Sequence, residues 1–108
     1  MNVMNHIKTK DEWLQRINNE NVIALFTADW CPDCQVIKPD LPDIEAAFPS
    51  YTFIVVNRDE LLEIAQDYGV MGIPSFLAFH QGEEAGRFVS KDRKTKEEII
   101  AFLKDLPN

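Results

Sequence analysis

The chain has 108 residues, of which 45% are hydrophobic and 27% charged, a composition typical of a single globular domain spanning residues 1–108. Its formal net charge of −7 makes DNA or RNA an unfavourable partner, because like charges repel. No apolar run approaches the roughly 18 residues that a membrane span needs, and the opening MNVMNHIKTKDEW lacks the apolar core of a signal peptide. We therefore expect a cytoplasmic protein that binds neither nucleic acid nor membrane.

The first part of the chain contains signals for one helix and one buried strand. Thr9 and Glu12 match a capping box, which predicts a helix over residues 10–18. After a polar break, the apolar run NVIALFT predicts a buried strand over residues 21–27. A short edge strand near residues 3–8 could precede the helix.

A kinked helix and a second buried strand are predicted next. Apolar residues recur at helical spacing at Cys34, Ile37, Leu41, Ile44 and Phe48. Pro39 and Pro42 fall inside this helix and should kink it, because proline has no N–H to donate and its ring crowds the preceding turn. The β-branched run TFIVVN then predicts a strand over residues 52–57.

The second half begins with signals for a helix and a hairpin. Asp59 can cap a helix that reaches Tyr68, and Gly69 would end it. The runs SFLAFH (75–80) and AGRFVS (85–90) flank QGEE, which predicts a β-hairpin.

A second capping box begins the last predicted helix. Thr95 and Glu98 satisfy its pattern, and the buried stripe would consist of Ile99, Phe102, Leu103 and Leu106. The basic run KDRKTK (91–96) precedes this helix, and we interpret it as solvated surface. Successive strand, helix and strand imply a right-handed parallel crossover, whereas the final hairpin must add antiparallel strands. The predicted fold class is therefore α/β, with a mixed sheet covered by helices on both faces.

The two cysteines lie in ADWCPDCQ (28–35), where the first buried strand ends and the kinked helix begins. Pro32 disfavours helical backbone at the residue before it and suits the first helical position, so Cys31 becomes the N-cap residue. An N-cap thiolate faces free backbone N–H groups and the positive end of the helix dipole, which lowers its pKa. Cys34 lies one turn along and further from solvent. This arrangement predicts that Cys31 is the attacking thiol and Cys34 the resolving thiol.

Three other roles for the cysteine pair fit the sequence less well. A disulfide that closes a loop of four residues stabilises a protein by only about 2 kcal/mol in the chain-entropy model. A tetrahedral zinc site needs four ligands, and the only two histidines, His6 and His80, are far apart in the sequence. Haem attachment requires a histidine after the second cysteine, where the chain has Gln35. We therefore favour a redox couple that uses no metal and no cofactor.

With these motifs in place, the chain resembles thioredoxin over nearly its whole length. The similar segments are ADWCPDC, the Lys38–Pro39 pair and GVMGIPSFLAFHQGEEAGRF (69–88). The resemblance implies the thioredoxin fold, with about five strands flanked by four helices, and a cis peptide bond between Ile73 and Pro74 that faces the dithiol. It also implies that the backbone of Ile73 pairs with an extended substrate segment. Trp30, Ile73 and Pro74 are thus candidate substrate-binding residues, with Trp30 covering one side of the dithiol.

The chain also departs from the thioredoxin pattern. Pro32 and Asp33 replace the Gly-Pro of the usual WCGPC motif, and Ser90 aligns with a common glycine. The family's buried aspartate aligns with Leu25 and its lysine partner aligns near Val55. The charge of Asp33 lies beside the Cys31 thiolate, so it should raise the pKa of Cys31 by about half a unit or somewhat more. These changes bring general protein-disulfide reduction into question but leave the dithiol chemistry intact.

The predicted function is thiol–disulfide oxidoreduction, in which the Cys31–Cys34 couple reduces protein disulfides. The predicted partners are disulfide-containing protein or small-thiol substrates and a thioredoxin-reductase-like electron donor, and the protein is expected to be a monomer. One alternative is glutaredoxin-like reduction of small-thiol mixed disulfides; the Cys-Pro-x-Cys order favours it, but QGEEAGRF lacks the Gly-Gly-x-Asp pattern that holds glutathione. The other alternative is a redox-controlled binding module without turnover.

Overall fold

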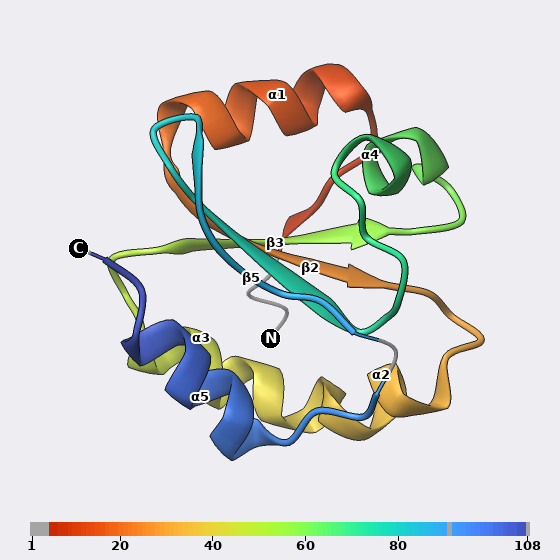
Figure 1. Cartoon of the computed structure of the whole chain (residues 1–108), viewed down its shortest axis with the longest axis vertical. Helices are drawn as coiled ribbons and strands as arrows, with labels where there is room; N and C mark the ends of the chain where they lie inside the picture. The colour runs from red at the N-terminus through yellow and green to blue at the C-terminus, as the bar shows by residue number, and fades with distance from the viewer. Residues whose placement is uncertain (1–4, 91, 108) are drawn as a thin grey trace.

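The structure, a computed structural model, describes residues 5–90 and 92–107. Five strands form one mixed sheet in the order β1–β3–β2–β4–β5 (Figure 1). The strands are β1 (Asn5–His6), β2 (Asn21–Thr27), β3 (Thr52–Asn57), β4 (Ser75–His80) and β5 (Glu83–Phe88). β2 is parallel to β3 and antiparallel to β4, and β5 is antiparallel to β4, which confirms the predicted mixed sheet. The part of the predicted edge strand before Asn5 lies outside the described residues.

Helices cover both faces of this sheet (Figure 1). They are α1 (Lys10–Asn19), α2 (Pro32–Ile37), the 3-10 turn η1 (Lys38–Asp40), α3 (Leu41–Ala47), α4 (Leu62–Asp67) and α5 (Lys96–Lys104). α1 and α4 lie on one face, and α2, α3 and α5 lie on the other. Each face buries its own apolar cluster, the first around Trp13 and Phe26 and the second around Phe53 and Phe76. When α2, η1 and α3 are counted as one kinked helix, the structure has the four helices that the resemblance implies.

The kink predicted between residues 34 and 48 is present. α2, η1 and α3 follow one another directly, and Pro39 and Pro42 occupy the first turns of η1 and α3. A proline can neither donate an N–H to the preceding turn nor let that turn close normally, so the helix tightens locally before it continues.

The prediction that Asp59 caps the next helix is wrong. α4 begins at Leu62, and its N-cap position is held by Leu61, whose apolar side chain cannot accept a hydrogen bond. The side chain of Asn57 instead accepts the backbone N–H groups of Asp59 and Glu60, at 2.9 and 3.1 Å. This turn at the end of β3 delays the helix and leaves the carboxylate of Asp59 free for another partner.

The predicted hairpin exists, but its second strand begins and ends two residues earlier than the sequence indicated. The turn consists of Gln81 and Gly82 alone, with φ of 51° and 92°, and His80 pairs directly with Glu83. Positive φ at both central residues is typical of the two-residue turns whose twist matches that of paired strands. The two glutamates therefore belong to β5 rather than to the loop.

The interpretation of residues 91–96 as solvated surface is wrong for Lys94. This side chain is 1% exposed and packs its ammonium 5.2 Å from the centre of the Phe88 ring. Its Nζ donates to the backbone oxygens of Ser90 and Asp92 and to the hydroxyl of Ser90, at 3.0 to 3.1 Å. Lys91 lies outside the described residues.

Burial lowers the pKa of Lys94 below its usual 10.5, although the charges of Asp92, Glu98 and Asp33 oppose the shift. Between the lowered folded-state pKa and 10.5, the unfolded chain keeps a proton that the folded chain has lost. The free energy of unfolding should therefore rise with pH in this window, relative to a Lys94→Met variant. Urea unfolding of both proteins between pH 7 and pH 10 measures the unfolding free energy of the wild type minus that of the variant. A value that stays constant or falls as the pH rises would contradict the prediction.

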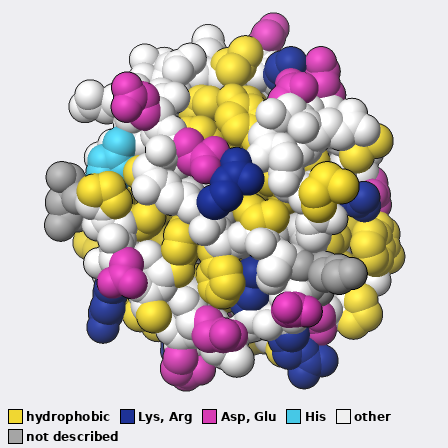
Figure 2. Space-filling model, in the orientation of Figure 1, with side chains coloured by type: hydrophobic (Ala, Val, Ile, Leu, Met, Phe, Trp, Pro, Cys, Tyr) yellow, Lys and Arg dark blue, Asp and Glu magenta, His cyan; other side chains and the backbone are white. Residues whose placement is uncertain are grey.

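Charged side chains are scattered over the face shown in Figure 2, between hydrophobic and uncharged polar ones. Among the described residues, no helix has the length and apolar character needed to cross a membrane.

Candidate active site

Cys31 and Cys34 form a disulfide with 5.2 Å between their Cα atoms, at the start of α2. Pro32 is the first residue of the helix and Cys31 is its N-cap, as the sequence indicated. The backbone N–H of Cys34 donates to Sγ of Cys31 at 3.1 Å. In the reduced form the same donor would stabilise a thiolate on Cys31, because a hydrogen bond to the charged form lowers a pKa.

The expectation that Cys34 lies further from solvent is not met in the disulfide form. Cys31 is 3% exposed and Cys34 is 5% exposed, so exposure does not distinguish the two sulfurs. Their positions distinguish them, because of the two described cysteines only Cys31 lines the groove that lies next to the disulfide. A substrate in this groove would meet Cys31 first.

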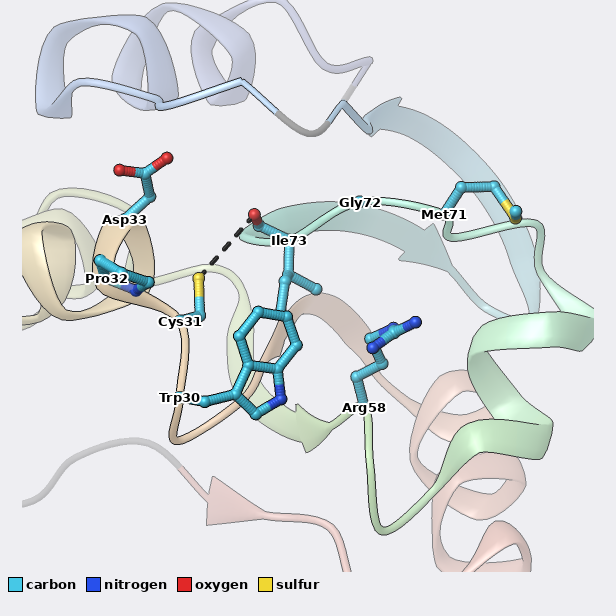
Figure 3. A pocket seen from close by; sticks show the side chains of 8 residues that line it. All are labelled: Trp30, Cys31, Pro32, Asp33, Arg58, Met71, Gly72 and Ile73. Carbon is cyan, nitrogen blue, oxygen red and sulfur yellow. Dashed lines mark hydrogen bonds between the residues drawn. The ribbon is translucent and has the colours of Figure 1, made fainter.

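The groove has a volume of about 300 Å³ and is drawn in Figure 3. Its lining residues come from three chain segments and comprise Trp30, Cys31, Pro32, Asp33, Arg58, Met71, Gly72 and Ile73. The antiparallel register places Phe26 opposite Ser75, so the end of β2 and the start of β4 meet at one edge of the sheet. This register brings the predicted residues Trp30 and Ile73 together around Cys31.

The loop before β4 faces the dithiol, as the resemblance implies. The peptide bond between Ile73 and Pro74 is cis. The carbonyl oxygen of Ile73 lies 3.9 Å from Sγ of Cys31, a contact drawn dashed in Figure 3. A disulfide sulfur carries no hydrogen, so this contact becomes a hydrogen bond only when Cys31 is a thiol.

Trp30 is held by a residue that sequence reasoning assigned to another role. Its indole N–H donates to the carboxylate of Asp59 at 2.7 Å, while the indole remains 60% exposed. Arg58 lies beside that carboxylate at 3.5 Å and also lines the groove. A signal for this loop was available in the sequence, because β2 and β3 are parallel and their carboxyl ends share an edge.

Asp33 has a partner that the sequence did not indicate. Figure 3 shows its carboxylate pointing away from Trp30 and Arg58. The carboxylate accepts a hydrogen bond from Nε of Arg93 at 3.0 Å, so its charge is paired and not isolated beside Cys31. The residues are sixty positions apart, and local sequence patterns do not report such a contact.

Leu25 and Val55 occupy the positions that align with the family's buried aspartate and its lysine partner. The two residues are direct partners in the register of β2 and β3 and are 4% and 5% exposed. Both pack in the apolar cluster that includes Ile37 of α2. An acid–base pair is therefore absent from these two positions.

Within residues 5–90 and 92–107, no group of three or more histidine, cysteine, aspartate and glutamate side chains is placed to hold a metal ion.

Comparison with known proteins agrees with this geometry. The thioredoxin family model matches residues 4–105. Mitochondrial thioredoxin-2 of Schizosaccharomyces pombe is 33% identical over 99 residues, covering 91% of this chain and 74% of the relative. Thioredoxin H4-1 of Oryza sativa is 29% identical, covering 92% and 79%. The solved structure of thioredoxin NaTrxh from Nicotiana alata has a TM-score of 0.81 and 27% identity, covering 97% of this chain and 94% of that one.

A dithiol–disulfide pair at the helix N-terminus of this fold is the site of a thiol–disulfide oxidoreductase. The chain belongs to the thioredoxin family.

Proposed function

We propose that this oxidoreductase reduces disulfide bonds in protein substrates, with Cys31 as the attacking thiol and Cys34 as the resolving thiol. The thiolate of Cys31 attacks one substrate sulfur, a mixed disulfide forms, and the other substrate sulfur leaves as a thiolate. Cys34 then attacks Sγ of Cys31, the internal disulfide forms, and the second substrate thiolate leaves. Two electrons have passed to the substrate, and a reductase must return two to the protein.

The observation that carries this assignment is the position of Sγ of Cys31. It accepts the N–H of Cys34 at the start of α2 and at the same time borders the groove. A sulfur in this place is stabilised as a thiolate and can be reached by a substrate, and an attacking thiol needs both properties. Cys34 lies within disulfide distance of this sulfur and is not among the residues that line the groove.

The groove supports an extended protein segment as substrate. The carbonyl of Ile73 borders Sγ of Cys31, where it could pair with the backbone of an added strand. Trp30 and Met71, 60% and 84% exposed, offer apolar contact beside it. The proposed electron donor is a thioredoxin-reductase-like enzyme, and the proposed setting is a monomer in the cytoplasm.

Turnover of different substrates tests the proposed function. Insulin disulfides should be reduced repeatedly when NADPH and a thioredoxin reductase supply electrons, and Cys31→Ser should abolish this reduction. Activity confined to mixed disulfides between glutathione and a small thiol would instead identify a glutaredoxin-like enzyme. Binding of a disulfide-containing protein without release of thiols would identify a redox-controlled binding module.

A further inference from the structure

The segment between β5 and α5 packs against the dithiol motif, although the sequence describes it as a run of charges. Figure 1 shows this segment passing the start of α2. Two neighbouring cations in it have different surroundings. Lys94 is fully buried, whereas Arg93 lies at the surface and pairs with Asp33.

Lys94 holds the backbone of this segment in place. Its ammonium has three protons, and its three hydrogen bonds go to Ser90 and Asp92 of the same segment. The N–H of Asp92 also donates to the hydroxyl of Ser90, at 3.3 Å. The three acceptors offset only part of the cost of burying the ammonium, and these contacts hold the backbone of the segment in place.

The fixed segment determines where Arg93 can reach. The side chain of Arg93 is 63% exposed, and its guanidinium lies 3.0 Å from the carboxylate of Asp33. An exposed arginine without such a partner would spread over many solvated rotamers. Asp33 is the second residue of α2, two positions from Cys31, and it lines the same groove as Cys31.

We infer that Arg93 is a positioning residue for the dithiol, whose ion pair with Asp33 offsets the repulsion between that carboxylate and the Cys31 thiolate. Lys94 holds the backbone of the segment that contains Arg93, and so places Arg93 within reach of Asp33. This inference rests on the proposed role of Cys31 as the attacking thiol. In this inference the Asp33 carboxylate and the Arg93 guanidinium act together, because each holds the other in position near Cys31.

The sign of each substitution's effect follows from this ion pair. In Arg93→Gln the carboxylate is left unpaired, so the thiolate is less stable, the pKa of Cys31 rises and the reduction potential falls. In Asp33→Asn the guanidinium loses its anchor and moves into solvent, so a further Arg93→Gln changes little. A single charge on the order of 6–10 Å away in water shifts a pKa by about 0.3 to 0.5 units.

The experiment titrates Cys31 by pH-dependent alkylation at low salt in a Cys34→Ser background, where Cys31 is the remaining thiol. Arg93→Gln should raise the pKa of Cys31 by about 0.3 to 0.5 units, and by less than about 0.1 units when Asp33→Asn is already present. Arg93→Lys should restore most of the difference, and 0.5 M salt should reduce it. Lys96→Gln is the matched control, because Lys96 pairs with Asp43 of α3 and its loss changes the net charge equally.

Two results would overturn the inference. One is an unchanged or lowered pKa of Cys31 in Arg93→Gln, and the other is an equal shift with and without Asp33. The proposed function has a separate readout in the same Cys34→Ser protein, which should trap a protein disulfide on Cys31. Trapping without an effect of Arg93 rejects the ion-pair role and leaves the function standing, whereas loss of trapping rejects the function itself.

Discussion

Cys34→Ser should accumulate a mixed disulfide with protein substrates, whereas Cys31→Ser should trap almost none. The Cys31 sulfur accepts the N–H of Cys34 at the start of α2 and borders the groove, so we expect its thiol to be the more acidic of the two and the one that a substrate in the groove meets. A thiol with a pKa near 7 is about half ionised at pH 7, while one at 8.5 is a few per cent ionised. The two variants should therefore differ by roughly tenfold or more in trapping rate at pH 7.

Non-reducing electrophoresis after rapid alkylation measures the trapped complex, and mass spectrometry locates the linking cysteine. The variant with both cysteines replaced is the control for binding without a covalent link. Equal trapping by the two single variants would show that the roles are assigned wrongly.

Leu25→Asp should give the largest loss of stability among the substitutions considered. Leu25 is buried mid-strand, with Val55 and Phe76 as its register partners on either side. A carboxylate there loses its hydration and faces apolar neighbours, which should cost about 4 kcal/mol or more of unfolding free energy at pH 7. Leu25→Asn is the matched control, because it has similar volume and polarity but no charge.

The pH dependence separates the charge from the change in shape. Burial would raise the pKa of an aspartate at this position above the unfolded value of about 3.9. Below that value the group is protonated in both states, and stability falls as pH rises towards the folded-state pKa. Urea unfolding at pH 4 and pH 7 should show Leu25→Asp losing stability relative to Leu25→Asn as the pH rises. Parallel curves for the two variants would mean that the position is hydrated.

The local chemistry of the active site could be predicted from the sequence. Pro32 restricts the backbone of Cys31 and starts the helix, and these effects act between adjacent residues. The side-chain N-cap of Thr9, the capping box of Thr95 and the prolines that kink the helix act within one turn, although the Glu12 carboxylate accepts from the N–H of Lys8 and so leaves the box predicted at Thr9 incomplete. For that reason the N-cap position of Cys31 and most element boundaries are found where the patterns predicted them.

Errors arose where two local signals competed. Asp59 is a good N-cap by residue type, but Asn57 two residues earlier captures the free N–H groups and moves the start of α4. Gln81 and Gly82 make the shortest hairpin turn, although the glutamates that follow have little preference for strands. Pairing with β4 outweighs that preference, because each paired residue gains cross-strand contacts that an isolated residue lacks.

Other contacts of the site were decided by the tertiary structure alone. The sequence does not indicate that Asp59 would hold the Trp30 indole or that Arg93 would reach Asp33, because each pair depends on how side chains far apart in the chain are placed within the folded protein. Burial of Lys94 is also invisible locally, since a charged run is normally solvated and only the fold of the surrounding segment supplies three acceptors. The N-cap position of Cys31 thus follows from its neighbours in the chain, whereas the charges around it come from packing between residues far apart in the sequence.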